Sequence, residues 1–355
     1  MRTDLSSDSL KKLKAIAKTE ILRQQVQTLF IQSTNRKDFG AELPWSHDED
    51  DHLLSSQPSA QVLQSILCQQ MPNRRSFYIH GPTNEANDRI NLSTTEVTTW
   101  ILSVVAETGL NIRSFSVDLI GEHLSSTSYG SGWLRGLRLQ ASSMRQGTKF
   151  RKGWAHLQFL HLHLDIKSDT ASWTCDLVPN LKKLSLAFCS SDEDACLKVL
   201  ALELPPLKEL CLSGTYVTEA VLLRFLTSSR PSLQALTLRL IYLDASLDAS
   251  GSWRSVLKGF RDDFTQLKSI SLLGIHRIGS TTHTPGGSSQ RSRVFFTPLA
   301  QGAPIPGTQG EQFDLRIKKL RQKPRVFAIS YKGHHVKEAL TVLEEYVEYI
   351  EPHML

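Results

Sequence analysis

The chain has 355 residues, of which 40% are hydrophobic, and a formal net charge of +6. That length suits two ordinary globular domains or one long repeat array. No apolar run approaches the roughly 18 residues that a membrane span needs, and residues 1–18 lack the apolar core of a signal peptide. The basic residues are scattered instead of forming a stripe, which argues against a nucleic-acid partner.

The cysteines support the same picture. There are five of them, and none forms a C-x-x-C pair. This pattern is typical of buried thiols in a reducing compartment and not of a disulfide framework. We therefore expect an intracellular protein, cytoplasmic or nuclear, with no membrane partner.

The N-terminal part alternates between helical and strand patterns. Apolar residues at helical spacing predict an amphipathic helix over 8–23, and a strand follows at 26–32. Residues 33–57 are polar and acidic, and they indicate a solvated loop. A helix over 58–70 and a strand over 76–80 come next. Ser93 and Glu96 have the spacing of a capping box, which predicts a helix that begins there and ends at Gly109.

The central part is organised by a repeat. The pattern Leu-x-x-Leu-x-Leu occurs three times with a period of 26 residues, at Leu181, Leu207 and Leu233. This pattern at this period is the signature of leucine-rich repeats. Weaker copies continue the series in both directions, around Phe77, Phe115, Leu137, Leu160 and Ile270.

Each repeat combines two periodicities. The leucine segment alternates as a strand does, and the residues after it have helical spacing until a proline such as Pro231 ends the helix. One such unit cannot bury its leucines alone, but stacked units can. We expect the α/β class: a leucine-rich-repeat-like solenoid with a curved parallel sheet on the concave side and helices on the convex side, over residues 1–278.

The composition changes after Gly279. Residues 279–324 are rich in Gly, Ser, Thr and Pro, and such a segment buries too little apolar surface to offset its ordering entropy. We expect a disordered insertion there. Residues 325–355 then predict a strand followed by a helix over 335–350, which would cap the solenoid.

Candidate chemistry is sparse. His161 and His163 lie two residues apart, so on a strand they share one face and could hold zinc if a third ligand came from elsewhere. Nucleophile-elbow, phosphate-loop and dinucleotide-binding motifs are absent from the sequence. We therefore expect no enzyme activity and no cofactor, with a metal-dependent enzyme that uses these histidines as the alternative.

The residues that flank the ladder leucines should point away from the core and form the concave face. Exposed aromatic and arginine side chains are the types that dominate protein interfaces. We expect the following residues to form a protein-binding surface for a protein target that the sequence does not identify: Tyr78, Arg138, Phe159, His161, His163, Lys183, Glu209 and Arg239. A second alternative is nucleic-acid binding through the basic members of this set.

Residues 9–31, SLKKLKAIAKTEILRQQVQTLFI, together with the repeats from Leu157 to Leu272, resemble fungal F-box-like leucine-rich-repeat proteins. The resemblance implies a substrate receptor that recruits a target through its repeats and joins a cullin-RING ubiquitin ligase through an F-box. The F-box itself is not found, because Leu43-Pro44 is followed by a polar, acidic segment. We expect a noncatalytic protein-interaction module, of F-box type but lacking the F-box, for which a ligase adaptor is a partner only if an F-box is supplied elsewhere.

Overall fold

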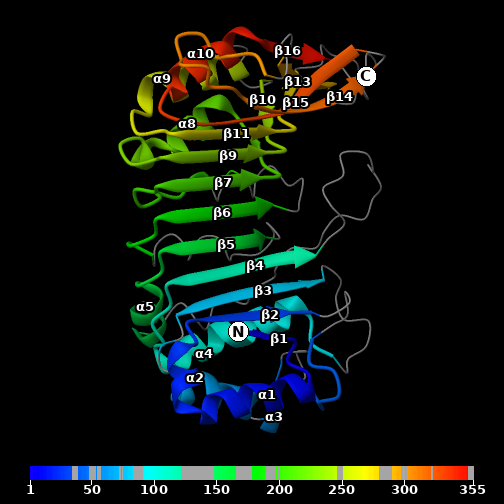
Figure 1. The fold of residues 1–355 in the computed structure, drawn as a ribbon, viewed down its shortest axis with the longest axis vertical. Helices are drawn as coiled ribbons and strands as arrows, with labels where there is room; N and C mark the ends of the chain where they lie inside the picture. The colour runs from blue at the N-terminus through cyan, green and yellow to red at the C-terminus, as the bar shows by residue number, and fades with distance from the viewer. Residues whose placement is uncertain are drawn as a thin grey trace. The chain divides into compact units, whose positions relative to one another are not determined.

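The computed structural model describes residues 1–33, 39–47, 53, 57–71, 73, 75–82, 91–120, 148–164, 178–188, 197, 200–245, 251–279, 290–296, 299, 302–320 and 323–350. The chain divides into two compact units, Met1–Leu181 and Lys182–Leu355. The predicted α/β class is confirmed, because both units combine helices with strands of a long, mostly parallel sheet (Figure 1).

The sheet of the first unit follows chain order. Its described strands are all parallel: β1 (Arg2–Thr3), β2 (Thr28–Gln32), β3 (Ser76–Pro82), β4 (Ser114–Ile120) and β5 (Phe159–Leu164). Leu29, Phe77 and Phe115 lie in register across the sheet and are fully buried. Because side chains alternate along a strand, the residues next to them fall on the opposite face.

The helices of the first unit are α1 (Ser7–Lys18), α2 (Glu20–Gln25), α3 (Pro58–Ser65), α4 (Thr94–Thr108) and α5 (Thr148–Trp154), and a π-helical turn (Ile66–Gln70) continues α3. The single helix predicted over 8–23 is two helices, because Thr19 has an extended backbone. The predicted capping box of α4 is confirmed. The Ser93 hydroxyl accepts from the Glu96 backbone N–H at 3.2 Å, and the Glu96 carboxylate accepts from the Ser93 N–H at 2.6 Å.

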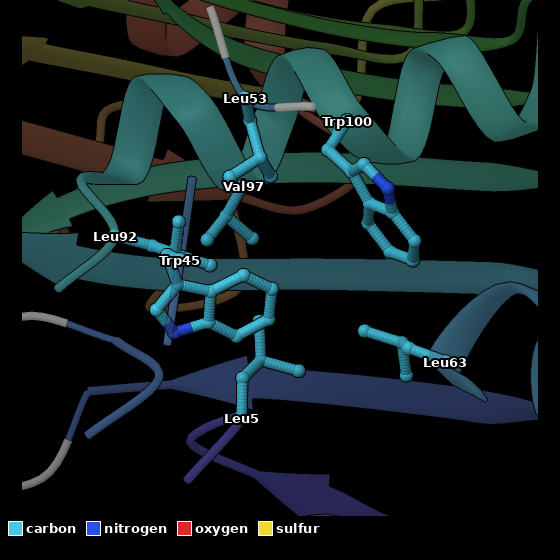
Figure 2. Close-up of a pocket in the computed structure, with 7 residues that line it drawn as sticks. All are labelled: Leu5, Trp45, Leu53, Leu63, Leu92, Val97 and Trp100. Carbon is cyan, nitrogen blue, oxygen red and sulfur yellow. The ribbon is translucent and has the colours of Figure 1, made fainter. Parts of the chain in front are cut away.

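Part of the predicted solvated loop over 33–57 packs into the core instead. Phe39 is fully buried, and the Trp45 ring lies in an apolar cluster (Figure 2). The cluster consists of Leu5, Trp45, Leu53, Leu63, Leu92, Val97 and Trp100, and the space between them is too small for a water molecule. The Trp45 indole N–H donates to the Gly40 carbonyl at 2.8 Å, so its one polar atom is satisfied. The acidic run 48–51 lies outside the described residues.

The main sheet of the second unit contains the strong repeats. Strands β6 (Lys183–Phe188), β7 (Glu209–Ser213), β9 (Ala235–Arg239) and β11 (Ser269–Leu273) are parallel. Leu184, Leu210 and Leu236 pair across neighbouring strands and are buried, so the predicted leucine ladder is confirmed. Beyond β11 the direction reverses: β15 (Lys323–Lys332) is antiparallel to β11, and β14 (Asp314–Leu320) follows as the last strand.

A second sheet in this unit was not predicted. Its order is β16 (Val347–Ile350), β13 (Gln290–Phe296), β12 (His276–Gly279), β10 (Tyr242–Asp244) and β8 (Tyr216–Val217). Strands β8, β10 and β12 each begin shortly after a main strand, beyond a residue with positive φ at Gly214, Leu240 or Gly274. The described helices of the unit are α8 (Glu219–Phe225), a 3-10 turn (Thr227–Ser229), α9 (Trp253–Asp263) and α10 (Val336–Glu345).

Two predictions for the C-terminal part are corrected by these strands. Residues 279–324 contain β13 and β14, so the expected disordered insertion is wrong for these two segments. Val294, Phe295 and Phe296 are fully buried. The prediction missed this short apolar segment because the residues around it are rich in Gly, Ser and Pro. The helix predicted over 335–350 ends at Glu345, because Val347–Ile350 pairs with β13 as strand β16.

Candidate functional site

Three aromatic side chains lie side by side on the open face of the first unit's sheet. The rings of Phe30 on β2 and Tyr78 on β3 stack with centroids 5.0 Å apart, and Tyr78 lies 6.4 Å from the ring of Phe159 on β5. Phe30 is 42% exposed, while Tyr78 and Phe159 are half-buried. We call Phe30, Tyr78 and Phe159 the aromatic patch.

The small residues of β4 make this contact geometrically possible. Strands β3 and β5 flank β4 and so lie about 10 Å apart. Between them β4 presents Ser114 and Ser116, which are short and buried. The rings of Tyr78 and Phe159 therefore approach each other across β4, and the Ser114 hydroxyl donates to the Tyr78 hydroxyl oxygen at 3.3 Å.

Polar residues continue the same face. His80 on β3 and Asp118 on β4 are in register, and His80 Nδ1 lies 3.3 Å from an Asp118 carboxylate oxygen. His161 on β5 is in register with Ser116 and is half-buried. The face thus combines an apolar centre with polar neighbours, which is the usual composition of a protein-binding surface.

On the second unit, two of the predicted residues bind each other. Lys183 on β6 and Glu209 on β7 are in register, and their charged atoms lie 2.6 Å apart. Both side chains are about half exposed, at 48% and 47%. An exposed pair of this kind contributes at most about 1 kcal/mol to stability. Because each charge is already neutralised by the other, neither residue offers an unpaired charge to a partner.

Arg239 lies in a separate groove at the other end of the same sheet. The groove has a volume of about 190 Å³ and is lined by Arg239, Ser271, Leu273, Asp314, Arg316, Ala328, Ile329 and Ser330. These residues come from β9, β11, β15 and β14. The groove is therefore lined by both the parallel strands β9 and β11 and the antiparallel strands β15 and β14. We call this set the arginine groove.

The eight predicted binding residues therefore fall into separate places. Tyr78, Phe159 and His161 come together on the first unit, Lys183 and Glu209 pair on the second, and Arg239 lies in the arginine groove. Arg138 lies outside the described residues, and so does the side chain of His163 on β5. Among the described residues, no three side chains that could bind a metal ion lie close together. The described residues therefore provide no third ligand for the zinc site proposed at His161 and His163.

Sequence reasoning missed Phe30 and the second arginine, Arg316. Phe30 could have been found, because it lies in the strand predicted over 26–32, where alternation places it on the face opposite the apolar Leu29 and Ile31. Arg316 could not, because it lies in a segment whose composition predicted disorder.

A second polar cluster lies at the beginning of α10 and serves the fold. The Tyr331 hydroxyl donates to the Glu311 carboxylate, and its oxygen accepts from the His335 backbone N–H at 2.9 Å. Burial, and then the Glu311 hydrogen bond, raises the pKa of Tyr331 to about 12. The same hydrogen bond, followed by one from His335, lowers the pKa of Glu311. At neutral pH the phenol stays protonated and the carboxylate ionised, so the cluster ties residue 311 to α10.

No family model matches the chain, and no curated protein matches it. Within the described ranges, no helix combines the length and the apolar character that a bilayer crossing requires.

Proposed function

We propose that this chain is a noncatalytic protein-interaction module that binds its target through the aromatic patch. The observation that carries the proposal is the contact of Phe30, Tyr78 and Phe159 across four neighbouring strands, on the face opposite the buried row of Leu29, Phe77 and Phe115. An exposed cluster of large aromatic side chains costs solubility in a free protein and provides the strongest contributions when a partner covers it.

The register of the strands supports a repeat architecture for this module. In each unit the buried residues form rows across parallel strands, such as Leu29 with Phe77 and Leu184 with Leu210. Within this proposal the chain is a leucine-rich-repeat-like solenoid. The target then lies on the concave side of the curved sheet.

The resemblance to F-box-like leucine-rich-repeat proteins extends the proposal to a role. The chain would be the target-recognition part of a ubiquitin ligase, and an F-box would have to be supplied elsewhere. In this role the aromatic patch would be the surface that binds the target.

Site-specific photo-crosslinking tests the proposed binding face. A photoreactive phenylalanine analogue is placed at Phe30, and in a control at Ile21, which is 74% exposed on helix α2 and is not part of the patch. We expect the analogue at Phe30 to capture a defined protein that the analogue at Ile21 does not. A second substitution, Tyr78→Ala, should lower the yield at least about fivefold, because it removes the ring that stacks on position 30.

Three outcomes would contradict the proposal. Equal capture from positions 30 and 21 would mean nonspecific contact, and capture that survives Tyr78→Ala would place the partner elsewhere. Capture of RNA or DNA, with steep salt dependence, would favour the nucleic-acid alternative.

A further inference from the structure

The arginine groove is built by two rows of side chains on one sheet face. In the first row Arg239, Leu273, Ala328 and Arg316 lie in register on four neighbouring strands. In the second row Thr237, Ser271, Ser330 and Asp314 do the same. The two arginines therefore stand at opposite ends of one row, three strand spacings or about 14 Å apart at the backbone.

The hollow between them follows from the sizes of the intervening residues. Ser271, Ala328 and Ser330 are all short, whereas the arginines are long and exposed. A β-bulge adjoins this row: the pairing of β14 with β15 shifts between Arg316 and Ile317, which leaves Phe327 as an extra residue. A bulge increases the local twist and redirects side chains, and bulges are common beside binding sites.

The two guanidinium groups of the groove are not neutralised by a described acidic side chain, unlike three other arginines of the unit. Arg230, Arg261 and Arg325 each bind an acidic side chain. Within the part of the chain that the structure describes, Arg239 and Arg316 form no ion pair. Their donors are therefore available to a ligand, and the planar guanidinium matches the geometry of a carboxylate.

Asp314 restricts the kind of anion that fits. Its carboxylate lines the same groove and accepts from the Ser330 hydroxyl at 3.4 Å. A second negative charge nearby disfavours a dianionic phosphate more than a singly charged carboxylate. The carboxylate oxygens and the serine hydroxyls also provide acceptors for the backbone N–H groups of a bound chain.

The size of the groove indicates a side chain as the occupant. About 190 Å³ is smaller than the roughly 300–1,000 Å³ of typical small-molecule pockets. We propose that the arginine groove binds the carboxylate of a Glu or Asp side chain in an acidic segment of a partner protein. Arg239 and Arg316 are its donors. This proposal rests on the proposed protein-binding function but uses residues separate from the aromatic patch.

Peptide titration of the full chain tests the groove directly. The protein is labelled with nitrogen-15 at arginine, and the side-chain N–H signals are followed by NMR. The probes are the blocked peptide Gly-Ala-Glu-Ala-Gly, the same peptide with Gln in place of Glu, and inorganic phosphate. We expect saturable shifts of the Arg239 and Arg316 signals with the Glu peptide, weaker by at least about tenfold with the Gln peptide.

Variants assign the effect to the groove. Arg239→Gln and Arg316→Gln should each weaken binding of the Glu peptide at least about tenfold, whereas Lys208→Gln, an exposed residue with the same charge loss, should change it less than about twofold. Unchanged melting curves would show that the variants fold.

Other outcomes would overturn the proposal. These are equal shifts with phosphate, shifts spread over all arginines, or no shift at the groove. Crosslinking from Phe30 reports on the aromatic patch alone, so failure of one site is distinguishable from failure of the other.

Discussion

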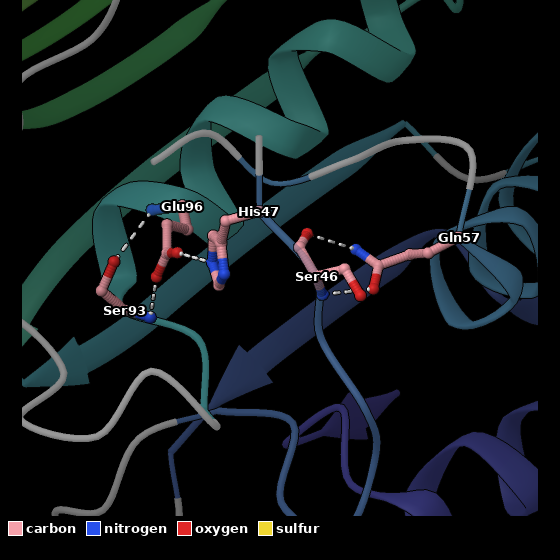
Figure 3. Close-up of polar contacts among 5 residues, drawn as sticks. All are labelled: Ser46, His47, Gln57, Ser93 and Glu96. Carbon is pink, nitrogen blue, oxygen red and sulfur yellow. Dashed lines mark hydrogen bonds and ion pairs between the residues drawn. The ribbon is translucent and has the colours of Figure 1, made fainter. Parts of the chain in front are cut away.

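His47 Nε2 lies 2.5 Å from a carboxylate oxygen of Glu96, and the other carboxylate oxygen of Glu96 accepts from the Ser93 N–H (Figure 3). One side chain therefore caps α4 and also fixes residue 47. Ser46 is held in turn by the Gln57 side chain, whose amide oxygen accepts from the Ser46 N–H at 2.8 Å (Figure 3). These bonds hold the segment that carries Trp45 against the core.

The first prediction concerns this double role. Glu96→Ala should lower the free energy of unfolding by about 1–2 kcal/mol, because a helix cap and the His47 contact are lost together. Glu96→Gln should cost less, since Gln also serves in a capping box. Glu107→Ala, at the exposed end of the same helix, is the control and should stay within about 0.5 kcal/mol. Urea unfolding measures all three, and a loss for Glu96→Ala no larger than that of the control would contradict the role.

A second prediction concerns Gly40. It has φ +78, and a Cβ atom there would collide with the Trp45 ring. Gly310 has a similar φ of +84, but nothing lies within 4 Å of its Cβ position. Gly310→Ala should therefore cost about 1–2 kcal/mol from backbone strain alone. Gly40→Ala should cost about 1–3 kcal/mol more, because Trp45 must move out of its packed cluster. Equal losses in thermal unfolding would show that Trp45 adjusts freely.

The leucine ladder gives a third prediction. Leu210 is buried between Leu184 and Leu236 on the neighbouring strands. Leu210→Ala should lower the free energy of unfolding by about 2–5 kcal/mol, as a buried truncation does. Ile317→Ala, at a position 40% exposed on β14, should stay within about 0.5 kcal/mol. A change within error for Leu210→Ala in urea unfolding would mean that the ladder is not a core.

A fourth prediction follows from the pKa of Tyr331. This pKa is raised from its ordinary 10.0 to about 12 in the folded chain. Between these values the unfolded chain loses the proton and the folded chain keeps it, so the free energy of unfolding should fall as pH rises from 10 toward 12. Below pH 10 this contribution is fully present.

Tyr331→Phe should remove that part of the alkaline pH dependence, because no titrating hydroxyl remains. The measurement is urea unfolding at pH 9, 10 and 11 for both proteins. Parallel pH profiles would show that Tyr331 titrates alike in both states.

The ladder could be predicted from sequence because its signal is repeated. Leu184, Leu210 and Leu236 recur at a constant period, and only stacking in register buries them all. The second sheet could not be predicted in the same way. Strands such as β8 are too short to show alternation. The sequence signal for this second sheet was that Tyr216 and Tyr242 recur at the same period of 26 residues. This signal is weak beside the repeated leucines.

The candidate site was predicted in part for a similar reason. Tyr78 and Phe159 could be placed on the open face from alternation along their own strands. Their contact depends on the short Ser114 and Ser116 between them, which is a property of three strands together. The arginine groove forms only because β15 runs antiparallel to β11 and places β14 beside it. The repeat period does not predict this change of strand direction.

That reversal also limits how the protein can change in length. A further 26-residue unit could be inserted between β7 and β9, where both neighbours run in the same direction and offer matching rows. After β11 there is no such place, because the antiparallel strand β15 pairs with β11 there, and β14 is antiparallel to β15 in turn. The hairpin of β14 and β15 thus limits growth by duplication, since a new parallel unit fits only upstream of it.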